Sequence, residues 1–344
     1  MHLVMRGSAT VLLLTLMVCG SALAQTGDGG FQVLKKLPLE GAGRWDYVTV
    51  DPDNHRVYVA RSTHVSVVDS EAGELVGDIP DTKGVHGVAV APDLGLGFIS
   101  VGGENKVVVF DLKTLQVDAK THLDTGGNPD SILYYPATHS VFVQNGRGDS
   151  SSVIDATSKK IVATIPLGGK PEYAVYDDKG NIFINLETSG SIAVVDAVNK
   201  TLKTTWKIAG CDAPSGLAID RSSDTLFAAC TDSKVLAVVN GKNGQLLQTL
   251  PIGADCDGAF FDPTTGYVFA SNGDGKLTIV HRDGAGKYSV TQNLDTLPGS
   301  KTMGYDPTAH KAYIPSAKFT GEPTSKPRPA SVPGSIALLV IGKQ

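Results

Sequence analysis

Seven charged or polar side chains recur along this chain at intervals of about 42 residues. Seven similar segments align on a proline or polar residue that follows an apolar stretch, and each of these side chains stands six positions before that residue. The seven positions are Asp46, His86, Asp130, Glu172, Ser215, Asp257 and Lys301. If the fold gathers them around one axis, four carboxylates, an imidazole and an amine could bind a hard divalent cation or a polar ligand.

A metal site is one use of this set. Asp46, Asp130, Glu172 and Asp257 would then be the metal ligands, and His86 would be the catalytic base if the site is hydrolytic. Carboxylates held this close repel one another, which raises the pKa of some of them unless a cation intervenes. The alternative is that the side chains cap strand starts or face a water-filled channel, because their spacing matches no recognised metal motif.

Other polar and aromatic residues stand near these positions. Trp45 precedes Asp46 and could stack on a ring-shaped ligand or serve only in packing. The residues that we expect to bind a ligand are Trp45, Asp46, His86, Asp130, Glu172, Asp257 and Lys301. Arg61 and His64 are expected in a loop of the same face, where a lone histidine is usually solvated. The tripeptide Arg-Gly-Asp at 147–149 is short enough to be a chance match.

The elements that must position these residues are short strands. Each repeat begins with an apolar strand that ends in Asp-Pro or a relative of it. A turn, a second strand and a third strand follow, and a fourth strand follows in six repeats. No helical period is present. The first strands are "YVTVDPD" (47–53), "GVAVAPD" (87–93), "SILYYPA" (131–137), "YAVYDDK" (173–179), "GLAIDRS" (216–222), "GAFFDPT" (258–264) and "MGYDPTA" (303–309).

Four antiparallel strands repeated seven times predict an all-β fold, a seven-bladed β-propeller in a single domain over 25–344. The last repeat stops after its third strand at Val340 and Ile341. The segment "FQVLKKLPL" (31–39) has the pattern of an outer strand. We therefore expect the N-terminal strand to close the ring by completing the last blade.

Chain direction assigns the seven positions to one face, which we call the top face. The innermost strand of each blade starts there, and the second strand returns there. The last blade carries a Pro-rich, locally basic insertion at 317–335 between its second and third strands. Long loops in compact domains are often functional. We expect this insertion to fold over the acidic channel mouth as a lid or docking arm.

These repeats resemble the YVTN repeats, named for a Tyr-Val-Thr-Asn strand end. The matching segments are Tyr58-Val59-Ala60-Arg61 and Phe142-Val143-Gln144-Asn145, and the resemblance covers nearly all of 31–344. Within that group, "CDAPSGLAIDRSSDTLFAAC", "SNGDGKLTIVHRDGAGKYSV" and "KTMGYDPTAHKAYIPSAK" are similar to bacterial secreted YncE-like proteins. The resemblance implies the propeller fold and no particular activity.

The N-terminus has the pattern of a signal peptide over 1–24, with a basic residue, an apolar run too short for a membrane span, and a small-residue site before Ala24. We expect cleavage after Ala24 and a periplasmic or secreted protein. Loss of Arg6 with the leader changes the formal charge from -5 to -6. This acidic balance disfavours nucleic-acid binding, and we expect a monomer with no membrane span.

Three cysteines remain after cleavage, because Cys19 leaves with the leader. Cys211 and Cys230 flank the first hairpin of the fifth repeat, and counting across its turn places Cys230 opposite Ser215. In an oxidising compartment we expect a Cys211–Cys230 disulfide. Cys256 would then be a buried thiol, an intermolecular bridge or a soft metal ligand, and a Cys211–Cys256 bridge stays a competing arrangement.

Sequence motifs of common enzymes are absent: there is no Gly-x-Ser-x-Gly, no His-Glu-x-x-His and no phosphate loop. Two functions therefore remain. One is a binding or scaffold protein that uses its top face for a small molecule or a protein partner. The other is a metal-dependent lactonase or hydrolase with a divalent cation at the acidic ring.

Overall fold

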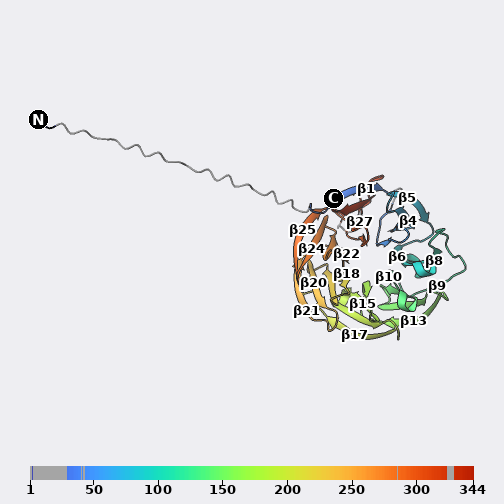
Figure 1. Ribbon diagram of the computed structural model, residues 1–344. Coiled ribbons are helices and arrows are strands. Elements are labelled where there is room, and N and C mark those ends of the chain that lie inside the picture. Colours follow the sequence, from blue (N-terminus) through green and yellow to red (C-terminus); the bar gives the residue numbers. More distant parts are fainter. Residues whose placement is uncertain (1, 3–28, 40, 42, 285, 324–328) are drawn as a thin grey trace.

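The computed structural model describes residues 2, 29–39, 41, 43–284, 286–323 and 329–344. Seven four-stranded sheets stand around a central channel, and the colours in Figure 1 pass from blade to blade in chain order. The predicted seven-bladed β-propeller is confirmed. The expected leader at 1–24 falls, except for His2, outside the described residues. Within the described ranges, no helix is long and apolar enough to cross a bilayer.

Each blade is an antiparallel sheet whose strands run from the channel outward. Blades one to three contain β2(Val48–Asp51), β3(Arg56–Arg61), β4(His64–Asp69), β5(Glu74–Ile79); β6(Val85–Ala91), β7(Leu96–Val101), β8(Lys106–Asp111), β9(Leu123–Asp124); β10(Pro129–Tyr135), β11(Ser140–Asn145), β12(Ser150–Asp155) and β13(Lys160–Pro166). Blades four and five contain β14(Pro171–Tyr176), β15(Asn181–Leu186), β16(Ser191–Asp196), β17(Thr201–Lys207); β18(Pro214–Asp220), β19(Thr225–Cys230), β20(Val235–Asn240) and β21(Leu246–Pro251). Blade six contains β22(Cys256–Phe261), β23(Tyr267–Asn272), β24(Lys276–Gly284) and β25(Lys287–Asp295).

The seventh blade joins the two ends of the chain. It contains β26(Gly304–Asp306), β27(Lys311–Ser316), β28(Ala337–Gly342) and, as its outer strand, β1(Gln32–Pro38). The strands β1 and β28 pair antiparallel, and their register runs from Gln32 opposite Gly342 to Pro38 opposite Ala337. Figure 1 shows β1 and β27 close to the C-terminus of the chain. Phe31 packs edge-on against Tyr267 and Phe269 of blade six. The expected closure by 31–39 is confirmed.

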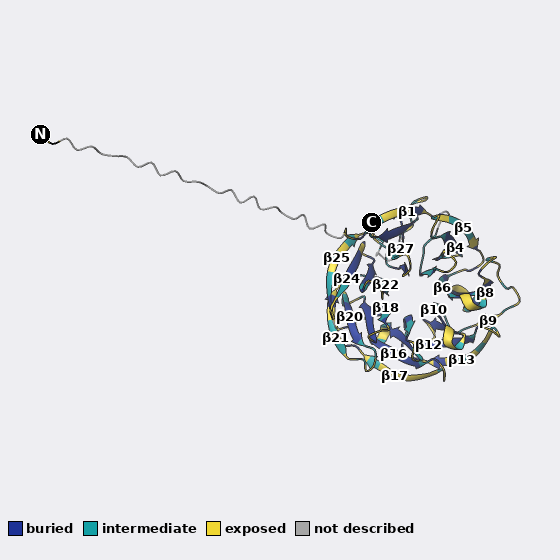
Figure 2. Cartoon of the chain, viewed as in Figure 1, coloured by how far each residue is buried: buried dark blue, intermediate teal, exposed yellow. Residues whose placement is uncertain are grey.

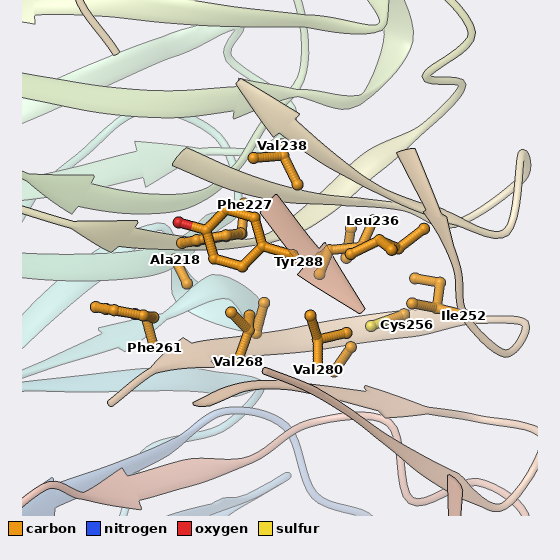
Figure 3. Packing of buried hydrophobic residues seen from close by; sticks show 14 residues of the cluster. Ala218, Phe227, Leu236, Val238, Ile252, Cys256, Phe261, Val268, Val280 and Tyr288 are labelled. Atoms are coloured by element: carbon orange, nitrogen blue, oxygen red, sulfur yellow. The ribbon is translucent and has the colours of Figure 1, made fainter. Parts of the chain in front are cut away.

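Apolar side chains fill the spaces between blades. Seven hydrophobic clusters each join two neighbouring blades. Figure 3 shows the cluster between blades five and six, where Phe227 stacks on Phe261 at 5.5 Å and meets Tyr288 edge-on at 5.0 Å. Figure 2 shows that exposed residues concentrate on outer strands such as β17. Burial of each such side chain contributes about 1.5–3 kcal/mol, so these clusters hold neighbouring blades together around the channel.

Blade two has an outer strand of only two residues, β9, where the repeat pattern predicts a longer one. Leu115 adopts a left-handed backbone with φ of 59° and directs its side chain toward Gly77 of β5. The segment then touches β8 again only at the Phe110–Val117 bridge before β9 begins. A turn then separates this bridge from β9: Asp118 accepts hydrogen bonds from the amide of Lys120 at 3.1 Å and from the hydroxyl of Thr121 at 2.8 Å.

Candidate functional site

The seven predicted side chains meet at the top of the channel. They line one cavity of about 740 Å³, and Trp45 stands at its rim. The predicted ring is therefore a physical cluster, with members from all seven blades. Its lining carries seven carboxyl groups, three lysines and one histidine. The full charged set is Asp46, Asp130, Glu172, Glu187, Asp232, Asp255, Asp257, Lys170, Lys234, Lys301 and His86.

β-Bulges position five of the seven ring residues. In blades two to six the register of the innermost strand shifts at the ring position, between Val85 and Gly87, Pro129 and Ile132, Pro171 and Ala174, Pro214 and Leu217, and Cys256 and Gly258. A bulge adds an unpaired residue and re-aims its side chain. This irregularity explains how residues at a strand start come to face the channel.

The remaining two ring residues, Asp46 and Lys301, precede the first strands of blades one and seven. Backbone hydrogen bonds tie these segments to their neighbours. The amide of Tyr47 donates to the carbonyl of His86 at 3.0 Å, and the amide of Asp257 donates to the carbonyl of Lys301 at 3.1 Å. Thr302 donates its hydroxyl to the carbonyl of Asp46 at 2.8 Å. These contacts close the ring across the junction of the chain ends.

Asp46, His86 and Asp130 form the tightest group of potential metal ligands among the described residues. Their ligand atoms all lie within 4.8 Å of one another. His86 Nδ1 is 2.7 Å from Asp46 Oδ2 and 3.7 Å from Asp130 Oδ1. The side chain of Asn128 hydrogen-bonds the imidazole and helps to fix its orientation. Two carboxylates and one imidazole nitrogen around one point can coordinate a divalent cation.

Burial and crowding shift the pKa of the acidic members. Burial, followed by the charge of Asp46, raises the pKa of Asp130 to about 7. Burial, followed by the charge of Asp130, raises the pKa of Glu172 to about 8. For His86 burial lowers the pKa, but the hydrogen bond to Asp46 and the charges of Asp130 and Asp46 outweigh it and raise the pKa to about 9. Without a bound cation, the cavity therefore retains protons at neutral pH.

Lysines hold the carboxylates on the opposite side of the ring. Lys170 donates to Glu172 at 2.5 Å and also pairs with Glu187. Ser215 lies between the two acidic ring residues, donating to Asp257 at 3.0 Å and lying 3.5 Å from Glu172. Glu172 is therefore engaged by a lysine, whereas Asp46 and Asp130 have only His86 between them.

The same arrangement recurs at the boundary of blades six and seven. Lys301 pairs with Asp257 and lies 3.4 Å from Asp255. Of the four carboxylates expected as metal ligands, the structure thus groups Asp46 and Asp130 with His86. It places Glu172 in contact with Lys170 and Asp257 in contact with Lys301.

Several residues in or beside the cavity were not predicted from the ring alignment. Lys170 and Asp255 each stand two positions before a ring residue, and so does Asn128. All three lie in the loop that enters a blade, directly before the innermost strand starts at Pro129, Pro171 or Cys256. The same alignment, read two positions earlier, would have found these three. Glu187 follows β15 and needs the fold to bring it near Lys170.

Trp45 has two neighbours of different kinds. One side lines the acidic cavity, and the ring also contacts Phe319 with centroids 5.8 Å apart. Phe319 belongs to the insertion at 317–335, whose described parts pair through a Phe319–Ser331 bridge. Arg44 donates to the carbonyl of Pro329 at 3.1 Å. The described parts of the insertion therefore support Trp45 beside the cavity, and none of them lines it.

Other residues singled out from the sequence lie apart from the cavity. Arg61 is buried at the end of β3, not in a loop as expected, because only two residues connect β3 to β4. His64 is half-buried 3.7 Å from Asp78, and burial lowers its pKa, so it is not simply solvated. The tripeptide at 147–149 forms the exposed turn between β11 and β12.

The cysteines are placed as expected. Cys211 and Cys230 form a disulfide with a Cα–Cα distance of 5.1 Å, and Cys256 is a buried free thiol. A Cys211–Cys256 bridge is therefore wrong. The expected position of Cys230 opposite Ser215 is off by one, because the bulge in β18 pairs Cys230 with Pro214. Burial raises the pKa of Cys256 well above its usual range, which makes it a poor metal ligand.

No family model matches the chain, and no curated protein matches it. Among solved structures, a chain of Kuenenia stuttgartiensis hydrazine synthase is similar, with a TM-score of 0.71. The match covers 80% of this chain and 94% of that chain at 15% sequence identity. At this identity the likeness shows a shared propeller fold alone.

Proposed function

We propose that this protein is a ligand-binding propeller whose top cavity holds a divalent cation between Asp46, His86 and Asp130. The observation that carries the proposal is that ligand atoms of these three side chains lie within 4.8 Å of one another. A cation at this point would neutralise the two carboxylates and displace the proton from Nδ1 of His86. The mixed oxygen and nitrogen ligands favour Mn²⁺ or Zn²⁺ over Mg²⁺.

The rest of the cavity would hold a polar ligand beside the cation. Lys170 and Lys301 are each shared between two carboxylates. An anionic group of a ligand could exchange places with one of these carboxylates and also meet the open coordination positions of the metal. A small hydroxylated or carboxylated molecule fits this combination of charges better than an apolar one.

A hydrolase is the second candidate, favoured by the short contact between Asp46 and His86. A carboxylate beside an imidazole is an arrangement that orients a catalytic base. However, a pKa of about 9 keeps His86 protonated at neutral pH, and a protonated imidazole cannot accept a proton. If a metal displaces that proton, Nδ1 becomes a ligand. A hydrolytic mechanism would therefore take its nucleophile from metal-bound water and use His86 to hold the metal.

Metal analysis of the purified mature protein, with a panel of lactones and esters, separates these functions. We expect stoichiometric Mn²⁺ or Zn²⁺, or saturable uptake of either ion after chelation, without turnover of the panel. Turnover that depends on the metal would support the hydrolase instead. Absence of any metal uptake would contradict both.

We further propose that the chain is exported and cleaved after Ala24. The leader-like sequence at 1–24 supports this, and so does the Cys211–Cys230 disulfide, because such bonds persist in oxidising compartments. The repeat segments support placing the chain among the YncE-like YVTN-repeat proteins. Mass spectrometry of the N-terminus of the protein from the periplasm tests the cleavage, and a leader still attached would contradict it.

A further inference from the structure

A second cavity occupies the lower end of the channel. It has a volume of about 620 Å³, within the range of small-molecule sites. Its walls come from the ends of the innermost strands β14, β18, β22 and β26, and from the turns that follow them. These strands start at the acidic cavity, so the two cavities lie at opposite ends of the same channel.

Aromatic and aliphatic side chains dominate this lower cavity. Tyr173, Tyr176 and Phe260 line it and are only half-buried, as are Leu133 and Ile219. The Tyr173 and Phe260 rings are 6.3 Å apart, and Tyr173 also contacts Tyr47, a residue that lines the upper cavity, at 5.4 Å. Rings thus separate an acidic compartment from an apolar one. Partly exposed rings facing a concave space provide stacking surfaces for a flat molecule.

One cation stands at the mouth of the lower cavity. The guanidinium of Arg221 lies 4.0 Å from the centre of the Tyr176 ring, and its Nε donates to the Tyr176 carbonyl at 3.0 Å. The Asp178 carboxylate is 3.8 Å from the Arg221 guanidinium, which is too far for a hydrogen bond. The Asp178 side chain is also 72% exposed to solvent. Tyr176 therefore holds the guanidinium at the cavity wall, and the side chain of Arg221 is 42% exposed there.

The other acidic group of the cavity is already neutralised. Asp220 is buried, and Arg282 donates to it at 2.8 Å. The hydroxyls of Ser222 and Ser223 also donate to it. Arg221 is therefore the cation that the lower cavity offers to a ligand.

We propose that the lower cavity is a separate binding site for a small organic anion that carries an apolar ring system. The rings would stack among Tyr173, Tyr176 and Phe260, and the acid group would meet Arg221 at the mouth. The chemistry of the wall excludes strongly hydrated ligands, whereas the upper cavity favours them. This site does not depend on the metal proposed above.

Two fluorescent probes test the proposal on the mature full-length protein. Anilinonaphthalene sulfonate has the expected ring system and an acid group, and phenylnaphthylamine has the same rings without the charge. We expect each to bind the wild type at one saturable site. Arg221→Gln should weaken sulfonate binding by at least about tenfold, because a charged hydrogen bond is worth about 1.5–3 kcal/mol. It should leave binding of the neutral probe within about twofold.

Two further variants make the result specific. Lys179→Gln removes a positive charge from the same face, at a side chain that does not line the cavity. It should leave both affinities unchanged. Ile219→Asn places an amide in the wall and should weaken both probes. Absence of saturable binding to the wild type, or an equal loss of sulfonate affinity in the Arg221 and Lys179 variants, would overturn the proposal. So would an unchanged affinity of the Arg221 variant.

Discussion

The Asp130 carboxylate lies in the top cavity with too little hydration and positive charge to stabilise its ionised form fully. Its side chain is 13% exposed, it faces His86 at 3.7 Å, and Asp46 contacts the same imidazole. Water cannot hydrate this carboxylate fully, and neighbouring negative charge opposes its ionisation. A proton or a metal ion relieves the same strain. This competition between protons and metal makes the site testable by pH.

We predict that the metal-free protein loses stability as the pH rises from about 4 to 9. A pKa raised by folding stabilises the folded state below the ordinary pKa, and this contribution is lost as the pH rises through the folded value. The folded values are about 7 for Asp130, about 8 for Glu172 and about 9 for His86. The Tm in the presence of a chelator should therefore fall across this range.

The variant Asp130→Asn removes one of these groups and should be less sensitive to pH. Its metal-free Tm at pH 8 should exceed that of the wild type by several degrees, since about 1 kcal/mol corresponds to roughly 2 °C or more. Asp53→Asn changes an exposed carboxylate far from the cavity and serves as the control. If the Tm of the two variants depends on pH in the same way, the ionisation of Asp130 does not destabilise the metal-free protein.

The disulfide gives a second prediction at this scale. Replacing both Cys211 and Cys230 with serine should lower the free energy of unfolding by about 3 kcal/mol, because the bond closes a loop with a sequence separation of 19. Urea denaturation of the oxidised wild type and the double variant measures the difference. An unchanged midpoint would mean that the bond adds nothing beyond the packing around it.

At the scale of elements, the bulges explain which parts of the site were predictable. The repeat alignment placed seven side chains at one strand start, and the structure brings all seven into one cavity. That position alone does not predict which ring residues form the group of potential metal ligands and which contact lysines. Asn128, Lys170 and Asp255 decide the division, and they stand two residues earlier, where the repeats differ in residue type.

The insertion at 317–335 carries the next prediction. Deleting 320–332 removes the hydrogen bonds from Arg44 to Pro329 and from Ser331 to Gly43. Phe319 remains but loses its bridge to Ser331, so the support of Trp45 would loosen. Ligand affinity at the top cavity should therefore fall while the Tm changes by only a few degrees. The affinity is measured by titrating the metal-loaded wild type and deletion variant with the same small carboxylated molecule, chosen because it binds the wild type. Unchanged affinity would leave the insertion without a role in the cavity.

At the scale of the whole molecule, ring closure depends on β1. The segment around β1 contributes three buried apolar side chains, Phe31, Leu37 and Leu39. Burial of each one stabilises the fold by about 1.5–3 kcal/mol. A chain that begins at Gly41 should therefore lose about 5 kcal/mol of stability or more, and a peptide of residues 29–39 added in trans should restore part of it. Thermal unfolding with and without the peptide tests this. A truncated chain as stable as the wild type would contradict closure by β1.

The fold was predictable because the same alternation of apolar residues, turns and strand ends recurs in every blade of a propeller. Exceptions arise where a contact outside the repeat decides the outcome. In blade two, Asp118 accepts hydrogen bonds from Lys120, Thr121 and Lys159 of the next blade, and a turn replaces the first part of the outer strand. The lower cavity was also missed, because its aromatic residues look like core positions until the strands are arranged around the channel.

Calorimetric titration of the chelator-treated protein with Mn²⁺ and Zn²⁺ tests the metal site at Asp46, His86 and Asp130 most directly. The wild type should bind one of these ions at a single saturable site, more tightly at pH 8 than at pH 6, because the metal displaces protons from the cavity. Asp130→Asn should lose this binding, and Asp53→Asn should retain it. Equal binding by the two variants, or no binding by the wild type, would contradict a metal site at Asp46, His86 and Asp130.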